Sequence, residues 1–134
     1  MSIVEKKNSQ ISLGSEIIKP EDEQTVSHII KQANKKKLPL EIVGTKTKKF
    51  IGYNLQVAKT LDLSNLSGII EYLPEELYIK VKPGTPVNLI EKTLEQKNQQ
   101  LAFEPIDFGY LNNGESNKGT IGGYVSCNFA GSRR

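Results

Sequence analysis

The chain has 134 residues, enough for one domain with an ordinary hydrophobic core. Its 18 basic and 15 acidic residues leave a net charge of +3, and its only arginines are Arg133 and Arg134, which argues against nucleic-acid binding. A single cysteine excludes an internal disulfide framework and is typical of a reducing, cytoplasmic compartment. One histidine and one cysteine far apart argue against a metal site, and no apolar run approaches the ~20 residues that span a bilayer.

The N-terminal region predicts a tail, a strand and a helix. We expect residues 1–14 to form a flexible tail and residues 15–134 to form the folded domain. Ile17–Pro20 predicts a short strand, and the helix after it begins at the acidic Glu21–Glu23 and ends at the basic Lys35–Lys37, as the helix dipole favours. His28 lies off the apolar stripe of this helix and is expected to face solvent. The stripe consists of Val26, Ile29, Ile30 and Ala33.

A buried strand at Leu40–Val43 is expected to run parallel to the first strand, which makes a strand–helix–strand unit. This strand breaks at Gly44 into a polar loop that is closed by Gly52. Backbone N–H groups in such a loop can point at one spot and bind an anion, above all the phosphates of a nucleotide cofactor. The alternative is an exposed basic connection. Hydroxyl groups and positive charge come from Thr45, Thr47, Lys46, Lys48 and Lys49.

The middle of the chain predicts a third strand and a hairpin. Thr60–Leu63 reads as a strand, and Ile69–Leu73 and Leu77–Val81 read as two strands joined by a tight turn at Pro74–Glu76. The alternation places Leu77, Ile79 and Val81 on the buried face. Antiparallel pairing after a parallel start indicates an α+β fold.

A second helix is expected to begin with Thr85 as its N-cap and Pro86 as its first residue, and to run to about Lys97. Its buried side is predicted to contain Val87, Ile90 and Leu94. Leu101–Phe103 predicts a further short strand, and Pro105–Asn117 predicts a long polar loop that covers or approaches something.

The stretch Gly119–Gly131 carries adjacent glycines, Gly122 and Gly123, at the head of a predicted helical turn. These glycines would let a flat ligand approach closely, and the helix N-terminus would supply unpaired N–H donors. The alternative is a glycine-rich turn needed for packing alone. Cys127 is predicted to pack beside Val125 and Phe129 rather than to act in redox chemistry.

Together, the loop at Gly44 and the segment Thr120–Gly123 resemble the FAD-binding domain of the vanillyl-alcohol oxidase and p-cresol methylhydroxylase type. Further segments are similar to the E subunits of bacterial glycolate oxidases (glycolate dehydrogenases), namely Pro74–Leu77, Gly84–Pro86, Gln100–Pro105 and Ala130–Arg134. The resemblance runs from about Ile17 to Arg134. It implies an α+β fold with an N-terminal βαβ subdomain and an incomplete second, antiparallel α+β subdomain.

The resemblance also implies the cofactor and its contacts. FAD is expected to be bound noncovalently, because the loop at Gly44 holds no histidine or cysteine for attachment. The loop would hold the pyrophosphate, and the Thr120–Gly123 segment would lie along the ribityl chain and flavin ring. The implied cofactor-binding residues are Gly44, Thr45, Lys46, Thr47, Lys48, Thr120, Gly122, Gly123, Asn128 and Gly131. No catalytic residue is expected, because neither glycine stretch contains His, Asp or Glu.

Three departures from the family pattern stand out. Thr45 and Lys46 follow Gly44 where the family has further glycines, so a positive φ at Thr45 would be strained. Ser132 stands where a proline is usual. The family domain continues beyond the point of Arg134 and a substrate domain follows it, so the chain is expected to be truncated at its C-terminus.

The expected function is therefore that of an FAD-binding fragment of a 2-hydroxy-acid oxidoreductase subunit, not catalytically complete alone. Its expected partners are other subunits of a glycolate oxidase-like complex, or a chain that supplies the missing half of the domain. The alternative is a truncated, non-catalytic remnant or one partner-dependent half of a split subunit.

Overall fold

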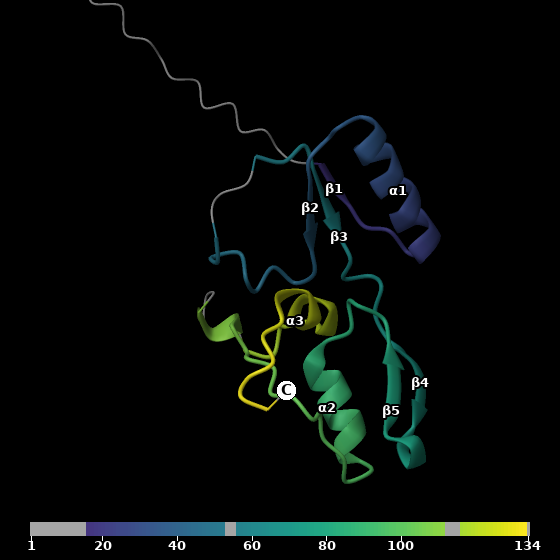
Figure 1. The fold of residues 1–134 in the computed structure, drawn as a ribbon, viewed down its shortest axis with the longest axis vertical. Helices are drawn as coiled ribbons and strands as arrows, with labels where there is room; N and C mark the ends of the chain where they lie inside the picture. Colours follow the sequence, from purple (N-terminus) through teal and green to yellow (C-terminus); the bar gives the residue numbers. More distant parts are fainter. Residues whose placement is uncertain (1–15, 53–55, 112–115, 134) are drawn as a thin grey trace, which may run out of the picture.

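The computed structural model describes residues 16–52, 56–111 and 116–133 (Figure 1). The expected tail at residues 1–14 lies outside these ranges. In chain order the elements are β1 (Glu16–Ile18), α1 (Glu23–Lys35), β2 (Leu40–Val43), β3 (Lys59–Asp62), β4 (Ile69–Leu73), the 3-10 helix η1 (Pro74–Glu76), β5 (Tyr78–Val81), α2 (Val87–Glu95), the 3-10 helix η2 (Gly109–Leu111) and α3 (Ile121–Cys127). A parallel sheet, an antiparallel hairpin and helices confirm the predicted α+β class.

The parallel sheet has the strand order β1–β3–β2, so β3 is its central strand. The prediction that β1 and β2 are parallel is confirmed, but each pairs with β3 rather than with the other. Leu61 of β3 is fully buried, whereas Ile42 of β2 is 57% exposed. The prediction of a buried β2 is therefore wrong, because β2 forms an edge of the described sheet.

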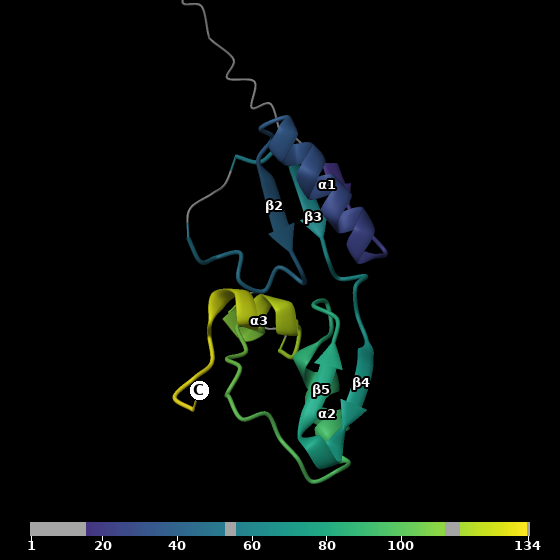
Figure 2. The same cartoon turned by 45° about the vertical axis from the view of Figure 1, so that its right-hand side comes forward.

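Helix α1 lies alongside this sheet (Figure 2). Its N-cap is Asp22, whose carboxylate accepts a hydrogen bond from Thr25 N at 2.6 Å. This bond lowers the pKa of Asp22. Ala33 is the buried member of the predicted stripe, and His28 is exposed as expected. The acidic start and basic end of the helix follow the macrodipole, as predicted.

The hairpin of β4 and β5 is antiparallel and η1 forms its turn, which confirms the predicted pairing. Leu77 is an exception to the predicted alternation. It has the left-handed φ of 54° and is 82% exposed, because the turn includes one residue more than predicted. Gln99 ties the hairpin to the chain after α2, since it accepts from Tyr72 Oη at 2.6 Å and donates to the Pro74 carbonyl at 2.7 Å.

Helix α2 buries Val87, Ile90 and Leu94, as the spacing predicts. The predicted N-cap is wrong by one position, because Pro86 occupies it. Thr85 is fully buried, and its hydroxyl lies 2.6 Å from the Lys82 carbonyl while it accepts from Gly68 N at 2.9 Å. Thr85 therefore links the turn after β5 to the start of β4.

The predicted strand at Leu101–Phe103 is wrong, since these residues belong to no strand. The segment after it is held to the C-terminal region by a hydrogen bond from Glu104 N to the Ala130 carbonyl at 2.9 Å. One such bond does not make a ladder.

Helix α3 forms as predicted and lies between the parallel sheet above it and the hairpin and α2 below it (Figures 1 and 2). Within the described ranges, no helix combines the length and apolar character needed to cross a membrane. The same residues contain no group of three His, Cys, Asp or Glu side chains placed to hold a metal ion.

Candidate cofactor-binding site

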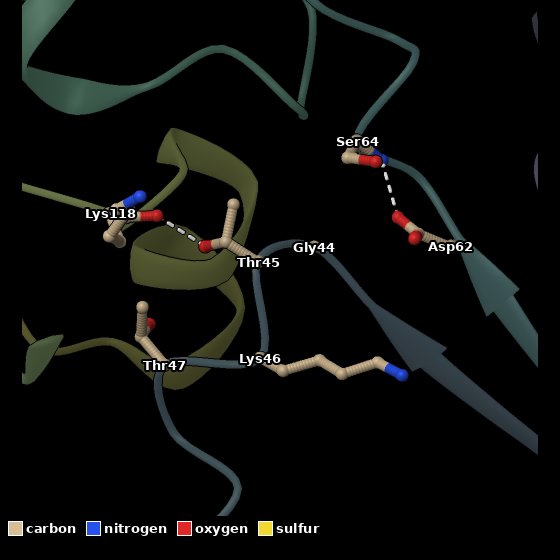
Figure 3. A pocket seen from close by; sticks show the side chains of 7 residues that line it. All are labelled: Gly44, Thr45, Lys46, Thr47, Asp62, Ser64 and Lys118. Atoms are coloured by element: carbon tan, nitrogen blue, oxygen red, sulfur yellow. Dashed lines mark hydrogen bonds between the residues drawn. The ribbon is translucent and has the colours of Figure 1, made fainter. Parts of the chain in front are cut away.

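The two glycine segments meet where β2 ends. A Cβ atom on Gly44 would lie 2.7 Å from Thr120 Oγ1, so the close approach of the Thr120 side chain to the loop backbone favours glycine here. The Thr45 hydroxyl donates a hydrogen bond to the Lys118 carbonyl (Figure 3). The sequence prediction that these distant segments lie together is thus confirmed by their contacts.

A cleft of about 410 Å³ opens between these segments, a size in the usual range of ligand sites. One wall is β2 with the loop 44–49, and the other is formed by residues around α3. The second wall contains Thr120, Gly122, Gly123, Ser126 and Cys127, and Leu63, Pro83 and Gly84 complete the lining. Of the predicted site residues, Gly44 to Lys48, Thr120, Gly122 and Gly123 line this cleft.

A smaller polar pocket of about 360 Å³ adjoins the loop (Figure 3). Its lining is Gly44, Thr45, Lys46, Thr47, Asp62, Ser64 and Lys118. Asp62 accepts from Ser64 N at 3.0 Å and pairs with Lys19 at 3.3 Å. These hydrogen bonds and the lysine charge outweigh burial and lower the pKa of Asp62. Asp62 and Ser64 were not predicted as site residues, although Asp62 ends the parallel strand β3 and Ser64 follows it, so both lie at the same sheet edge as Gly44.

The backbone N–H groups of the two walls differ in whether another residue accepts their hydrogen bonds. Ile121 N donates to the Thr85 carbonyl at 2.9 Å, and Gly122 N donates to the Pro83 carbonyl at 2.9 Å. Gly123 N donates to the hydroxyl of the N-cap Thr120 at 3.4 Å. The prediction that this helix start offers unpaired donors is therefore wrong, because the protein itself uses them.

In the loop, by contrast, the N–H groups of Gly44, Thr45, Thr47 and Lys48 donate to no other residue that the structure describes. Lys46 adopts the left-handed φ of 59°, whereas Thr45 does not have a positive φ. The strain expected at Thr45 is thus found one residue later. A turn with consecutive unbonded N–H groups and one left-handed residue is a suitable anion-binding site.

Lys48 connects the two walls. Its Nζ lies 4.1 Å from the centroid of the Tyr124 ring and 5.9 Å from that of Phe108, both within range of a cation–π contact. Burial lowers the pKa of Lys48, against the opposing effect of nearby Cys127 and Asp107. Burial also raises the pKa of Tyr124 to about 12, with help from the negative charges of Asp107 and Glu91.

The adjacent glycines of α3 have different surroundings. A Cβ on Gly122 would lie 2.8 Å from the carbonyl oxygen of Pro83, so Gly122 is needed for packing. A Cβ on Gly123 would meet Thr120 Oγ1 at 3.3 Å and Lys48 Nζ at 3.5 Å. The packing alternative therefore describes Gly122, and Gly123 is the glycine that leaves room in the cleft.

The remaining predicted residues lie elsewhere. Asn128 is the left-handed C-cap of α3, and Gly131 packs its backbone against Glu104; neither lines the cleft. Cys127 is exposed and lines the cleft, so its predicted packing role is wrong. The helix turns Val125 to solvent, at 69% exposure, while Phe129 packs on Phe108 with ring centroids 5.1 Å apart.

This arrangement fits a family of flavoproteins. Residues 15–134 match the family described as FAD binding domain, and the chain belongs to this family, of the p-cresol methylhydroxylase type. Over 111 residues it is 38% identical to glycolate oxidase subunit GlcE of Escherichia coli (strain K12). The match covers 83% of this chain and 29% of that relative, so the chain spans less than a third of the relative's length. The predicted resemblance is confirmed at both levels.

Proposed function

We propose that this chain binds FAD noncovalently in the cleft between the loop 44–49 and α3. The observation that carries the proposal is the contact of Gly44 with Thr120 beside a loop in which the N–H groups of Gly44, Thr45, Thr47 and Lys48 donate to no residue that the structure describes. In this proposal these four N–H groups hold the pyrophosphate, and the hydroxyls of Thr45 and Thr47 border the same place. FAD, when bound, supplies the hydride acceptor of an oxidation.

The other proposed residues shape the second wall. Thr120 fixes the start of α3, Gly122 seats the helix on Pro83, and Gly123 leaves space for the flavin side of the cofactor. Asn128 and Gly131 act at a distance from the cleft, by ending α3 and turning the chain toward Glu104.

The binding proposal is tested by titrating the purified 134-residue chain with FAD and recording flavin fluorescence. Saturable quenching at micromolar concentrations is expected. No saturation at tens of micromolar would contradict binding by this chain.

Noncovalent attachment is tested on the loaded protein. Denaturation in acid is expected to release all flavin into the supernatant. Cys127 lines the cleft and is the thiol to examine, so Cys127→Ser serves as the matched variant. Flavin that stays on the precipitated wild-type chain but not on Cys127→Ser would overturn the proposal and identify the attachment point.

For the whole protein we propose a role as part of a glycolate-oxidising flavoprotein, because the relative is a glycolate oxidase subunit. This chain would contribute cofactor contacts and not turn over substrate alone. We also propose that it works with other subunits of such a complex. The single cysteine favours the cytoplasm. Glycolate-dependent dye reduction by the FAD-loaded chain alone would contradict the proposal that this chain binds the cofactor but does not turn over substrate by itself.

The second candidate is one partner-dependent half of a split subunit. Several large apolar side chains are exposed, including Leu77 at 82% and Val125 at 69%. Such residues favour capture by another chain or self-association. A cooperative thermal transition of a monomer, checked by sedimentation velocity, would argue against this candidate.

A further inference from the structure

The side chain of Lys48 is directed at α3. Lys48 lines the cleft but not the polar pocket, whereas Lys46 lines both. The Lys48 Nζ lies over the ring of Tyr124, 4.1 Å from its centroid. A Cβ atom on Gly123, in the same helix, would lie 3.5 Å from this Nζ. The ammonium group of a loop residue is therefore held against the opposite wall of the cleft.

The ring that Lys48 contacts is firmly packed. Tyr124 is only 4% exposed, and a Cβ atom on Gly119 would lie 2.6 Å from its Oη, so the ring packs directly on the Gly119 backbone. The Gly119 carbonyl accepts a hydrogen bond from Val87 N of α2 at 3.0 Å. The ring thus belongs to a packed unit with α2 and α3, and Lys48 attaches the loop to this unit.

The contact of Lys48 lies between two other attachments of the loop. The Thr45 hydroxyl donates to the Lys118 carbonyl, and the Phe50 ring packs on Phe108 with centroids 6.0 Å apart. Most of the loop N–H groups that donate to no described residue lie from Thr45 to Lys48. Because these N–H groups have no described acceptor to orient them, the side-chain attachments on either side restrain their directions.

We propose that Lys48 is a positioning residue, whose ammonium group binds the face of Tyr124 and so holds the loop in the shape that presents its N–H groups to the cofactor. The proposal rests on the proposed FAD function. Lys48 acts through the loop backbone, and its ammonium group does not contact the pyrophosphate. A loop that already has its bound shape loses less entropy when the ligand binds, so the contact with Tyr124 raises affinity.

The test compares Lys48→Met, which removes the charge, with Lys48→Arg, which keeps a cation that stacks on aromatic rings. Lys92→Met, at an exposed position on α2, is the matched control. FAD affinity is measured by fluorescence at low and high salt, each variant against wild type at the same salt. Lys48→Met is expected to weaken binding about fivefold at both, because a half-buried cation–π contact is little screened. Lys48→Arg and Lys92→Met are expected to stay within about twofold of wild type.

Amide hydrogen exchange of the ligand-free chain gives a second readout that does not depend on FAD. The N–H groups of Lys49 and Ile51 donate to carbonyls within the loop, at 3.3 and 3.0 Å. Exchange at these two amides reports local opening of the loop. Lys48→Met is expected to speed it about fivefold, and Lys48→Arg to leave it within about twofold of wild type.

The outcomes separate this inference from the proposed function. A loss of FAD affinity in Lys48→Met that disappears at high salt would overturn the inference, because it would indicate a direct ion pair with the pyrophosphate. Unchanged exchange at Lys49 and Ile51 in Lys48→Met would also overturn it, as would a Lys48→Arg variant that behaves like Lys48→Met. If the wild-type chain binds no FAD, the proposed function fails. Faster exchange in Lys48→Met, restored in Lys48→Arg, would then still support Lys48 as the residue that holds the loop.

Discussion

The two walls of the cleft use backbone N–H groups in opposite ways. On the α3 wall, the first three N–H groups of the helix donate to the Thr85 carbonyl, the Pro83 carbonyl and the N-cap hydroxyl. On the loop wall, four N–H groups between residues 44 and 48 have no described partner. The two walls look alike in sequence, because each contains a glycine followed by a threonine, Gly44–Thr45 in the loop and Gly119–Thr120 before α3. The difference is that the α3 wall uses its N–H groups for packing, whereas these four N–H groups of the loop wall donate to no described residue, which is the basis of the proposed anion site.

The largest expected effect tests the packing wall. Gly122→Ala would place Cβ 2.8 Å from both Cβ and the carbonyl oxygen of Pro83, so the helix or the turn has to move. We expect a loss of about 2 kcal/mol in the free energy of unfolding, typical of overpacking. Urea denaturation followed by circular dichroism measures it.

Gly123→Ala is the matched control in the same helix. Its Cβ would lie 3.3 Å from Thr120 Oγ1, a tight contact that a shift of a few tenths of an ångström relieves, and alanine is the better helix former, so stability is expected to change much less than in Gly122→Ala. The new methyl group points toward Lys48 in the cleft, so FAD affinity is expected to fall instead. A larger loss of stability for Gly123→Ala than for Gly122→Ala would contradict the assignment of the two glycines.

The dependence of stability on alkaline pH tests the burial of Tyr124, whose ring contacts Lys48 and so connects the two walls. The pKa of Tyr124 is raised from 10.0 to about 12, so the folded state holds this proton more tightly than the unfolded state does. The resulting stabilisation is present below pH 10 and is lost as pH rises from 10 toward 12, by about 2 kcal/mol. Tyr124→Phe removes this part of the pH dependence.

The measurement is urea denaturation at several pH values between 8 and about 11. Tyr78→Phe, at an exposed position on β5, is the control and is expected to keep the wild-type slope. An unchanged slope in Tyr124→Phe would show that the buried phenol does not link stability to pH.

The N-cap of α3 gives a smaller effect. Thr120→Ala removes the acceptor of Gly123 N and is expected to lower stability by about 1 kcal/mol, while Thr120→Ser keeps the hydroxyl and most of the stability. Thermal unfolding of the two variants provides the comparison. Equal stability of Thr120→Ala and wild type would mean that the 3.4 Å bond contributes nothing.

The smallest expected effect on stability lies on the loop wall. Lys46→Gly relieves a left-handed φ of 59°, but glycine adds freedom to the unfolded chain, so the two terms nearly cancel within about 0.5 kcal/mol. FAD affinity is expected to fall because a pocket charge is lost. Thr45→Gly, at a residue without positive φ, is the control and is expected to lower stability. The reverse order of the two stabilities would place the strain at Thr45.

Short-range patterns in the sequence predicted most elements correctly. The spacing of Val87, Ile90 and Leu94 depends only on the period of a helix, and these residues are buried in α2. The apolar strands and their turns were found for the same reason. Strand order is set by contacts between distant segments, and local periodicity therefore could not reveal that β3 separates β1 from β2.

The candidate site was predicted in outline but not in its details. The meeting of the Gly44 and Thr120 segments came from the family resemblance, and the contacts confirm it. The use of the α3 N–H groups depends on where the Thr85 and Pro83 carbonyls lie, which no pattern in the sequence records. Lys118 lines the pocket from a segment that belongs to no helix or strand and has no motif of its own.

The central position of β3 has a consequence for how this domain forms during synthesis. Among the residues that the structure describes, neither β1 nor β2 has a hydrogen-bonding neighbour in the sheet until Lys59–Asp62 has left the ribosome. Until that moment the nascent segment can form α1 but no part of the sheet. The loop at Gly44 therefore gains its fixed shape late, after a strand that follows it in the chain has closed the sheet.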